Sequence, residues 1–206
     1  MSETMAETAP NDISLAPAAR QRRVRALDAF IDLVLEGNLP PTPEQVADRA
    51  GISIATFFRY FESLNSMRHD AAARMLERFP LLELEKIGEG TLHKRVEAFV
   101  ALRVALWEKV SLLARLQRTL VLQDEDAAKM VDRVRGIMAD QVRDHFAPEL
   151  RELTTAQRDD AVALVAMLTS VESWEQFRHA YRRSPLQTRR AWSAAIKGIL
   201  RGDNER

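Results

Sequence analysis

The chain has 206 residues, of which 46% are hydrophobic and 29% charged, a balance typical of a globular protein with one or two domains. Lys+Arg and Asp+Glu both number 30, so the formal net charge is zero and any nucleic-acid surface must be a local basic patch. The sequence has no cysteine, which excludes disulfides, thiolate nucleophiles and cysteine-based metal sites.

Residues 1–17 contain Glu3, Glu7 and Asp12 and lack an apolar core, so we expect a flexible tail and no signal peptide. The longest apolar run, Ala161–Leu168, is far shorter than the roughly 20 residues needed to span a bilayer. These features predict a soluble, cytoplasmic protein.

A helical pattern covers residues 18–36 and stops at a Gly-Asn pair. The sequence of Thr42–Gln45 matches a capping box, which predicts the start of a short second helix. This helix is expected to end at Gly51, in a left-handed turn too tight for a side chain. Ser53 is then expected to cap a third helix that runs to about Phe61.

Downstream, capping residues, acidic helix starts and prolines divide the chain into further helices, which gives about nine in all. They are expected near residues 63–79, 91–107, 109–122, 124–146, 154–183 and 184–200. No useful stretch alternates with period two, so the predicted fold class is all-α.

The segment Thr42–Phe61 therefore predicts two short helices joined by a tight turn, which is helix-turn-helix geometry. We expect the second of these helices to bury a stripe of Ile54, Phe57 and Phe61. The opposite face would expose side chains that suit DNA, because arginine can fork onto guanine and threonine can bind phosphate. These residues are Ala55, Thr56, Arg59 and Tyr60. Spacing alone does not separate this motif from an ordinary helical hairpin.

The run Val46–Phe61 resembles the signature of TetR-family transcriptional regulators. It lies behind a long first helix close to the N-terminus, where the family places it. Further along, Glu172–Arg178 followed by Ser184-Pro185 resembles the end of the family's penultimate helix and the start of its last. Four positions of the signature are matched together, namely Gly51, Ser53, Thr56 and Phe61.

The resemblance implies a helix-turn-helix DNA-binding domain over residues 18–64 and a helical regulatory and dimerisation domain over residues 65–206. It implies a homodimer that binds a pseudo-palindromic operator as a repressor and is released by a small effector. It implies no enzymatic activity, cofactor or metal. The family's DNA contacts fall on Thr42, Ile54, Ala55, Thr56, Phe58, Arg59 and Tyr60.

Three positions depart from the family's pattern. Phe58 replaces the usual tyrosine, Leu64 replaces a phosphate-binding lysine, and Ile54 is often polar or basic in the family. Each lost phosphate contact weakens DNA binding, which leaves a helical interaction module with a decayed DNA surface as an alternative function. A basic cluster at the first helix either compensates or is a solvated helix start, and consists of Arg20, Arg22, Arg23 and Arg25.

The helices between Thr91 and Arg183 resemble the family's pocket-forming helices, and their side chains predict a largely hydrophobic effector. Arg103 is the one charged member, which either orients an acidic or carbonyl group of the effector or faces solvent. The candidate effector residues, which could equally be plain core, are Phe99, Arg103, Leu106, Trp107, Met138, Met167, Trp174 and Phe177.

The resemblance also implies dimerisation through the last two helices. An apolar stripe near the C-terminus is the candidate interface, with packing inside one subunit as the alternative. This stripe consists of Trp192, Ile196, Ile199 and Leu200.

An enzyme with a catalytic helical cavity is the second rival function, although no catalytic constellation stands out in the sequence. His145 lies near Asp144 and Glu149, and we interpret the group as exposed charges at a helix end and not as a metal site.

Overall fold

A computed structural model describes residues 16–79, 90–119, 121 and 125–201 of the chain. This part contains ten α-helices, one π-helical turn and no strand, which confirms the all-α class. None of the described helices is long and apolar enough to cross a membrane. Most of the tail expected at residues 1–17 lies outside the described residues.

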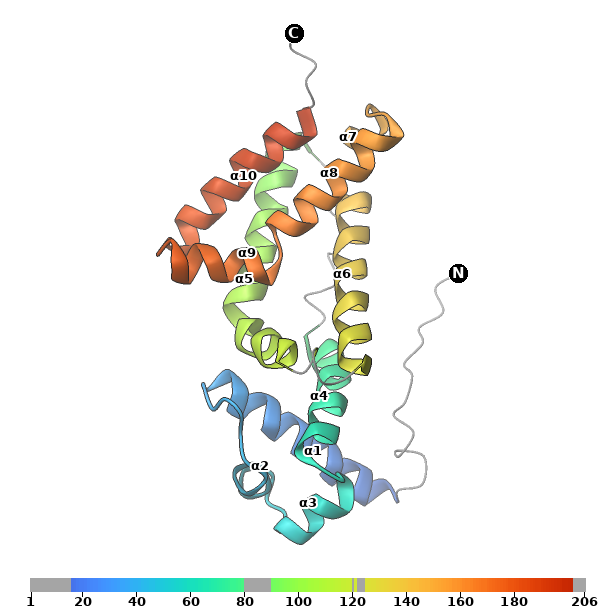
Figure 1. Cartoon of the computed structure of the whole chain (residues 1–206), viewed down its shortest axis with the longest axis vertical. Coiled ribbons are helices and arrows are strands. Elements are labelled where there is room, and N and C mark those ends of the chain that lie inside the picture. The colour runs from blue at the N-terminus through green and yellow to red at the C-terminus, as the bar shows by residue number, and fades with distance from the viewer. Residues whose placement is uncertain (1–15, 80–89, 120, 122–124, 202–206) are drawn as a thin grey trace. The chain divides into compact units, whose positions relative to one another are not determined.

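The first compact unit ends at Arg78 and contains the four helices expected in this region. They are α1 (Pro17–Leu35), α2 (Pro43–Ala50), α3 (Ile54–Tyr60) and α4 (Leu64–Arg78), shown in blue to green in Figure 1. The unit extends past residue 64, the boundary expected from the sequence, because α4 packs on α1.

Three ion pairs at intervals of about one helical turn join α1 to α4. Arg23 lies 2.6 Å from Asp70, Asp28 lies 2.9 Å from Arg74, and Asp32 lies 2.5 Å from Arg78. The first pair is the most buried, with only 5% and 14% of its two side chains exposed. These three ion pairs hold α4 against α1 and so fix the two ends of the segment that contains α2 and α3.

The second compact unit begins at Phe79. Its helices α5 and α6 are long, α5 packs on α6, α9 and α10, and α8 packs on α6 and α10 (Figure 1). The elements are α5 (Leu92–Arg118), α6 (Glu125–His145), α7 (Ala147–Arg151), α8 (Thr155–Leu168), α9 (Val171–Glu175), the π-helical turn η2 (Gln176–Ala180) and α10 (Pro185–Arg201).

Two predicted boundaries in this unit are wrong. The helices expected at residues 91–107 and 109–122 are one helix, α5, because neither glycine nor proline interrupts the chain between them. The single helix expected at residues 154–183 is broken after Leu168. There the Ser170 hydroxyl accepts a hydrogen bond of 3.2 Å from the Ser173 amide and so caps a new helix, α9.

Helix α7 was not expected from the sequence. Its Pro148 lies in the first turn of a helix, where the missing N–H costs no hydrogen bond, although prolines in this region were expected to separate helices.

Candidate functional site

The helix-turn-helix begins at a capping box on α2, as the sequence predicts. The Thr42 hydroxyl accepts a hydrogen bond of 3.3 Å from the Gln45 amide, and the Gln45 side chain accepts one of 2.8 Å from the Thr42 amide. Val46, Ala47 and Ala50 form the buried face of this helix. Thr42 itself is exposed, so its side chain remains accessible at the start of α2.

The turn between α2 and α3 depends on Gly51, which has φ +66° and ψ +40°. Its conformation lets the Ile52 amide donate to the Ala47 carbonyl at 3.0 Å and closes the end of α2. A Cβ at Gly51 would meet no atom within 4 Å, so the expected crowding is wrong. Glycine is favoured here because the backbone is left-handed.

Helix α3 starts at Ser53, as predicted. The Ser53 hydroxyl accepts a hydrogen bond of 3.2 Å from the Thr56 amide and lies 2.9 Å from the Thr56 hydroxyl. Phe57 and Phe61 are buried and lie 5.4 Å apart between ring centroids. These contacts fix the orientation of α3 relative to the core of the first unit.

Two residues of α3 lie on the opposite side from that predicted by the helical stripe. Ile54 was expected in the core but is 39% exposed, whereas Tyr60 was expected on the outer face but is only 6% exposed. The helix has fewer than two full turns. A small rotation about its axis is therefore enough to exchange Ile54 and Tyr60 between the buried and the exposed side. The burial of Tyr60 removes its hydroxyl from the surface that can meet DNA.

The exposed face of α3 combines one unpaired cation with two apolar side chains. Arg59 is exposed and has no carboxylate partner among the described residues; its guanidinium lies 5.5 Å from the Tyr60 ring centre. Phe58 is 52% exposed beside it. Together with Ile54, Ala55 and half-buried Thr56, these side chains form the outer face of the helix.

The neighbouring Arg49 differs from Arg59 because its guanidinium is already bound. It contacts both carboxylate oxygens of Glu36, at 2.9 and 2.7 Å. These hydrogen bonds hold the pKa of Glu36 below its ordinary value. Arg59 is therefore the cation of this motif that can bind an external acceptor without breaking an existing pair.

The basic cluster at the start of α1 is divided by the fold. Arg20, Arg22 and Arg25 are exposed, whereas Arg23 is 4% exposed, pairs with Asp70 and lies 5.2 Å from the Phe61 ring centre. Arg23 therefore supports the core of the first unit, and the interpretation of Arg23 as a surface cation is wrong.

Leu64, which stands where the TetR-like pattern has a phosphate-binding lysine, is the first residue of α4 and is partly buried.

Three of the candidate effector residues meet between α5 and α6. The Arg103 guanidinium donates a hydrogen bond of 3.2 Å to the Met138 carbonyl and lies 4.9 Å from the Phe99 ring centre. The same Phe99 ring stacks on His145 at 5.3 Å. Arg103 is 1% exposed, so the alternative in which it faces solvent is wrong.

His145 is 2% exposed, which corrects its interpretation as part of an exposed charge group. Its imidazole Nε2 lies 3.0 Å from the Arg95 carbonyl, and the Arg95 guanidinium pairs with Glu149. The cluster joins α5 to α6 and α7.

The other candidate effector residues lie elsewhere in the second unit. The Trp107 indole donates to the Thr169 carbonyl at 2.8 Å, and Leu106 is 2% exposed. Trp174 and Phe177 each contact Trp192 on α10, with ring centroids 6.3 and 6.1 Å apart.

Met167 is 65% exposed and thus outside this buried set. Among the described residues, no hydrogen bond or ring contact links Trp174 and Phe177 to the Phe99–Arg103–Met138 group.

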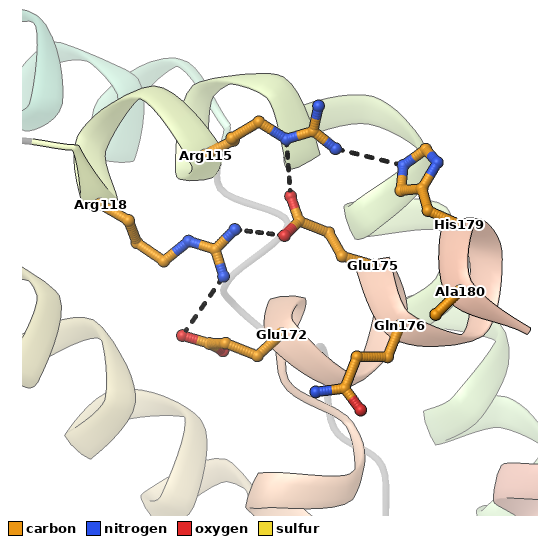
Figure 2. A pocket seen from close by; sticks show the side chains of 7 residues that line it. All are labelled: Arg115, Arg118, Glu172, Glu175, Gln176, His179 and Ala180. Carbon is orange, nitrogen blue, oxygen red and sulfur yellow. Dashed lines mark hydrogen bonds and ion pairs between the residues drawn. The ribbon is translucent and has the colours of Figure 1, made fainter.

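The second unit also has an open depression of about 590 Å³ between α5 and the α9–η2 segment (Figure 2). Its charges are paired with one another. The Glu175 carboxylate accepts hydrogen bonds from Arg115 and Arg118, and Arg118 also lies 3.7 Å from Glu172. Arg115 also lies 3.2 Å from His179, which the sequence analysis did not connect with it.

The apolar stripe expected at the dimer interface is mostly core. Trp192 and Ile196 are 0% exposed and Leu200 is 4% exposed, so α10 uses this face inside its own subunit. The outer face of α10 carries Leu186, which is 73% exposed, followed by exposed small residues at helical spacing. These small residues are Ala191, Ala194, Ala195 and Gly198.

Comparisons with known proteins identify repressors and regulators with this fold. The chain is 31% identical over 124 residues to the HTH-type transcriptional repressor KstR of Mycolicibacterium smegmatis, covering 59% of this chain and 61% of that relative. It is 27% identical over 171 residues to KstR of Rhodococcus jostii, covering 82% of this chain and 78% of that protein. The chain thus spans less than two thirds of the first of these relatives. No family model matches the chain.

Solved structures show the same fold. A transcriptional regulator from Rhodococcus sp. Rha1 aligns with a TM-score of 0.69 and 19% identity, covering 87% of this chain and 96% of that one. A TetR transcriptional regulator from Rhodococcus sp. RHA1 aligns with a TM-score of 0.54 and 24% identity, covering 90% and 100%. The chain thus has the fold of these transcriptional regulators.

The chain keeps the framework of the helix-turn-helix motif and departs from the TetR-like pattern on its outer surface. The framework residues of the signature, Gly51, Ser53 and Phe61, all have the turn, capping or core positions described above. The α1–α4 ion pairs were missed in the sequence because charges 46 or 47 positions apart carry no local periodic signal.

Proposed function

We propose that this chain is a DNA-binding transcriptional repressor in which α3 enters the major groove. The observation that carries this proposal is Arg59, an exposed and unpaired cation on a helix whose turn, caps and core are those of a helix-turn-helix. The Arg59 guanidinium can donate two hydrogen bonds to guanine. Thr42 is exposed at the start of α2, and we propose that its hydroxyl contacts a DNA phosphate.

The apolar residues on α3 also fit base recognition. Phe58 is 52% exposed and Ile54 is 39% exposed, and apolar side chains of this kind contact the methyl group of thymine. We therefore expect A·T pairs beside the guanine that Arg59 contacts. The same exposed apolar residues would suit the alternative function, a helical interaction module that no longer binds DNA.

The proposed repressor acts as a homodimer. Leu164 and Met167 on α8 are 45% and 65% exposed, and α8 packs on α10, whose outer face carries the small residues Ala191, Ala194 and Gly198. Small residues allow two helices to approach closely, and exposed apolar patches mark subunit interfaces. A two-fold dimer would place two copies of α3 in successive major grooves, about 34 Å apart.

Regulation is proposed to come from a small, largely apolar effector bound within the second unit. Phe99, Leu106, Trp107 and Met138 supply buried apolar surface there. An effector that binds one arrangement of the dimer more tightly will lower operator affinity, because coupling between two sites is reciprocal.

A selection of genomic DNA fragments by the purified full chain tests the proposed function. We expect enrichment of fragments that share a pseudo-palindromic sequence upstream of genes, and transcription of those genes should rise when the chain is deleted. Failure to enrich any fragment at low ionic strength, where phosphate contacts are strongest, would favour the interaction module.

A further inference from the structure

Arg103 on α5 is a buried cation that pairs with no carboxylate of the described residues. It is 1% exposed, and its guanidinium makes one hydrogen bond, from Nη2 to the Met138 carbonyl at 3.2 Å. Its Nε–H is buried and has no acceptor. The face of Phe99 lies 4.9 Å from the guanidinium carbon and provides only a weak substitute for an anion.

Within the described residues, the other two buried arginines both have carboxylate partners. Arg23 pairs with Asp70, and Arg95 pairs with Glu149. The chain therefore follows the general rule that a buried charge is paired, except at Arg103. Burial lowers the pKa of Arg103 to about 10, which still leaves the guanidinium charged at neutral pH.

A second unsatisfied polar group lies on the helix that faces Arg103. The side-chain oxygen of Gln141 on α6 is buried and has no hydrogen-bond partner, and it follows Met138 by one helical turn. Since α5 and α6 pack together, both of these helices carry a buried unsatisfied polar group, Arg103 Nε on α5 and Gln141 Oε1 on α6. Buried polar groups in that state need a ligand or solvent to complete them.

The surroundings of Arg103 are otherwise apolar. Phe99 is 0% exposed, Leu106 is 2% exposed and Met138 is 7% exposed. A group that binds here must therefore carry an anion for Arg103 and an apolar body for its neighbours.

We infer that the effector is an apolar organic acid whose carboxylate pairs with the Arg103 guanidinium between α5 and α6. This inference rests on the proposed regulatory function and specifies the chemistry of its ligand. The carboxylate would accept from the unpaired Nε–H together with one Nη–H, in the two-pronged geometry that arginine favours. The competing interpretation is that the Phe99 ring and the Met138 carbonyl suffice and that Arg103 is structural.

Matched acids and alcohols separate these interpretations. The probes are decanoate, tetradecanoate and 2-naphthoate, each compared with 1-decanol, 1-tetradecanol or 2-naphthalenemethanol by calorimetric titration of the full chain. We expect the wild type to bind at least one acid ten or more times more tightly than its alcohol. In Arg103→Met that preference should disappear, because the variant keeps a flexible unbranched side chain but removes the guanidinium and its charge.

Arg115→Met is the matched control, since Arg115 lies on the same helix and already pairs with Glu175 at 3.0 Å. It should keep the acid preference. Its loss in Arg115→Met would move the site to the depression in Figure 2 and overturn the inference. If Arg103→Met does not fold, as judged by circular dichroism, Arg103→Lys decides. The preference should then fall at least threefold, because an ammonium group cannot make the two-pronged contact.

Three results would overturn the inference. In the first, the wild type shows no preference for any acid over its alcohol. In the second, Arg103→Met keeps the wild-type preference, and in the third, Arg103→Lys does. Wild-type binding to its selected DNA fragments is measured in parallel without any probe. DNA binding without acid preference would overturn this inference alone, whereas acid preference without DNA binding would overturn the proposed function alone.

Discussion

Arg59 is the residue whose contribution to DNA recognition can be tested most directly. Arg59→Ala should weaken binding to the selected operator by about 1–3 kcal/mol, because it removes a two-pronged contact to guanine. It should also relax base preference at one position of each half-site. Fluorescence anisotropy with the operator and its single-base variants measures both effects.

Arg49→Ala is the matched control for this substitution. Its guanidinium is exposed like that of Arg59 but already binds Glu36, at 2.7 Å. We expect its effect on operator affinity to be much smaller and equal across base variants. Equal affinity of wild type and Arg59→Ala for the operator would disprove the assignment of Arg59 to base recognition.

Arg103 makes a second prediction at the scale of one residue, which concerns stability in the absence of ligand. The folded-state pKa of Arg103 lies near 10, well below its ordinary value, because burial disfavours the charged form. Each unit of pKa corresponds to about 1.4 kcal/mol, which sets an upper value of roughly 3 kcal/mol for this cost.

Arg103→Met removes the buried charge and keeps most of the buried volume. We expect the free energy of unfolding to rise by about 1–3 kcal/mol in urea titrations at neutral pH, because the variant removes the cost of burying a charge without a counter-charge. Arg115→Met should produce no comparable rise. A loss of stability in Arg103→Met would indicate that the guanidinium contributes to the fold through Phe99 and Met138.

At the scale of the element, local signals in the sequence predicted helix starts well. Thr42, Ser53, Thr91 and Thr154 all accept the capping hydrogen bonds expected of them. These starts are predictable because each depends on residues within one turn of chain. Ser170 also caps a helix, at the break between α8 and α9. This start was not predicted, because Ser170 lies inside a continuous apolar pattern that indicated one long helix.

The faces of helices were less predictable than their starts. Ile54 and Tyr60 exchanged their expected environments on α3, and the apolar stripe of α10 is used inside the subunit. Hydrophobic periodicity identifies that a face is buried, but it does not say whether the same subunit or a partner covers it. That information comes from the tertiary neighbours, here α5 and α8 for the helix α10.

The α1–α4 ion pairs lead to a prediction about how these elements hold together. Asp70→Ala should lower the free energy of unfolding by about 3 kcal/mol, because it leaves the Arg23 guanidinium, with 5% of its side chain exposed, without this carboxylate. Chemical denaturation, followed by far-ultraviolet circular dichroism, measures the change in the free energy of unfolding.

The exposed pair Arg49–Glu36 supplies the comparison for that experiment. Both of its side chains are largely in solvent, with 42% and 52% exposed, so Glu36→Ala should leave stability nearly unchanged. Equal effects of Asp70→Ala and Glu36→Ala would show that burial of the α1–α4 pair does not determine its contribution.

At the scale of the whole molecule, the two compact units divide the proposed work between DNA recognition and regulation. The first unit carries the exposed Arg59, whereas the second carries the buried Arg103 and the outer face of α8 and α10. The helix-turn-helix of the first unit could be predicted in detail because its signature lies in 16 consecutive residues, Val46–Phe61. The residues proposed for effector binding and dimerisation have no such compact signature, since they are distributed over α5, α6, α8 and α10.

The dimer prediction belongs to this scale and uses a residue that the monomer leaves exposed. Ala194 lies on the outer face of α10, between the exposed Ala191 and Gly198. Ala194→Glu should convert the dimer to a monomer at micromolar concentration, because it brings two charges and added volume to a two-fold contact between closely packed helices. The monomer should keep its helical content and bind the full operator weakly, since each copy then engages one half-site.

Sedimentation velocity, circular dichroism and operator titrations on the same samples test these outcomes. Ala73→Glu on α4 is the control, because it places the same charge at an exposed alanine of the first unit and should leave the sedimentation coefficient unchanged. Ile196→Glu is unsuitable as a test, since Ile196 is 0% exposed and a buried glutamate would unfold the subunit before any interface was measured. A wild type that sediments as a monomer, or an Ala194→Glu variant that remains a dimer, would remove this face of α8 and α10 as the subunit interface.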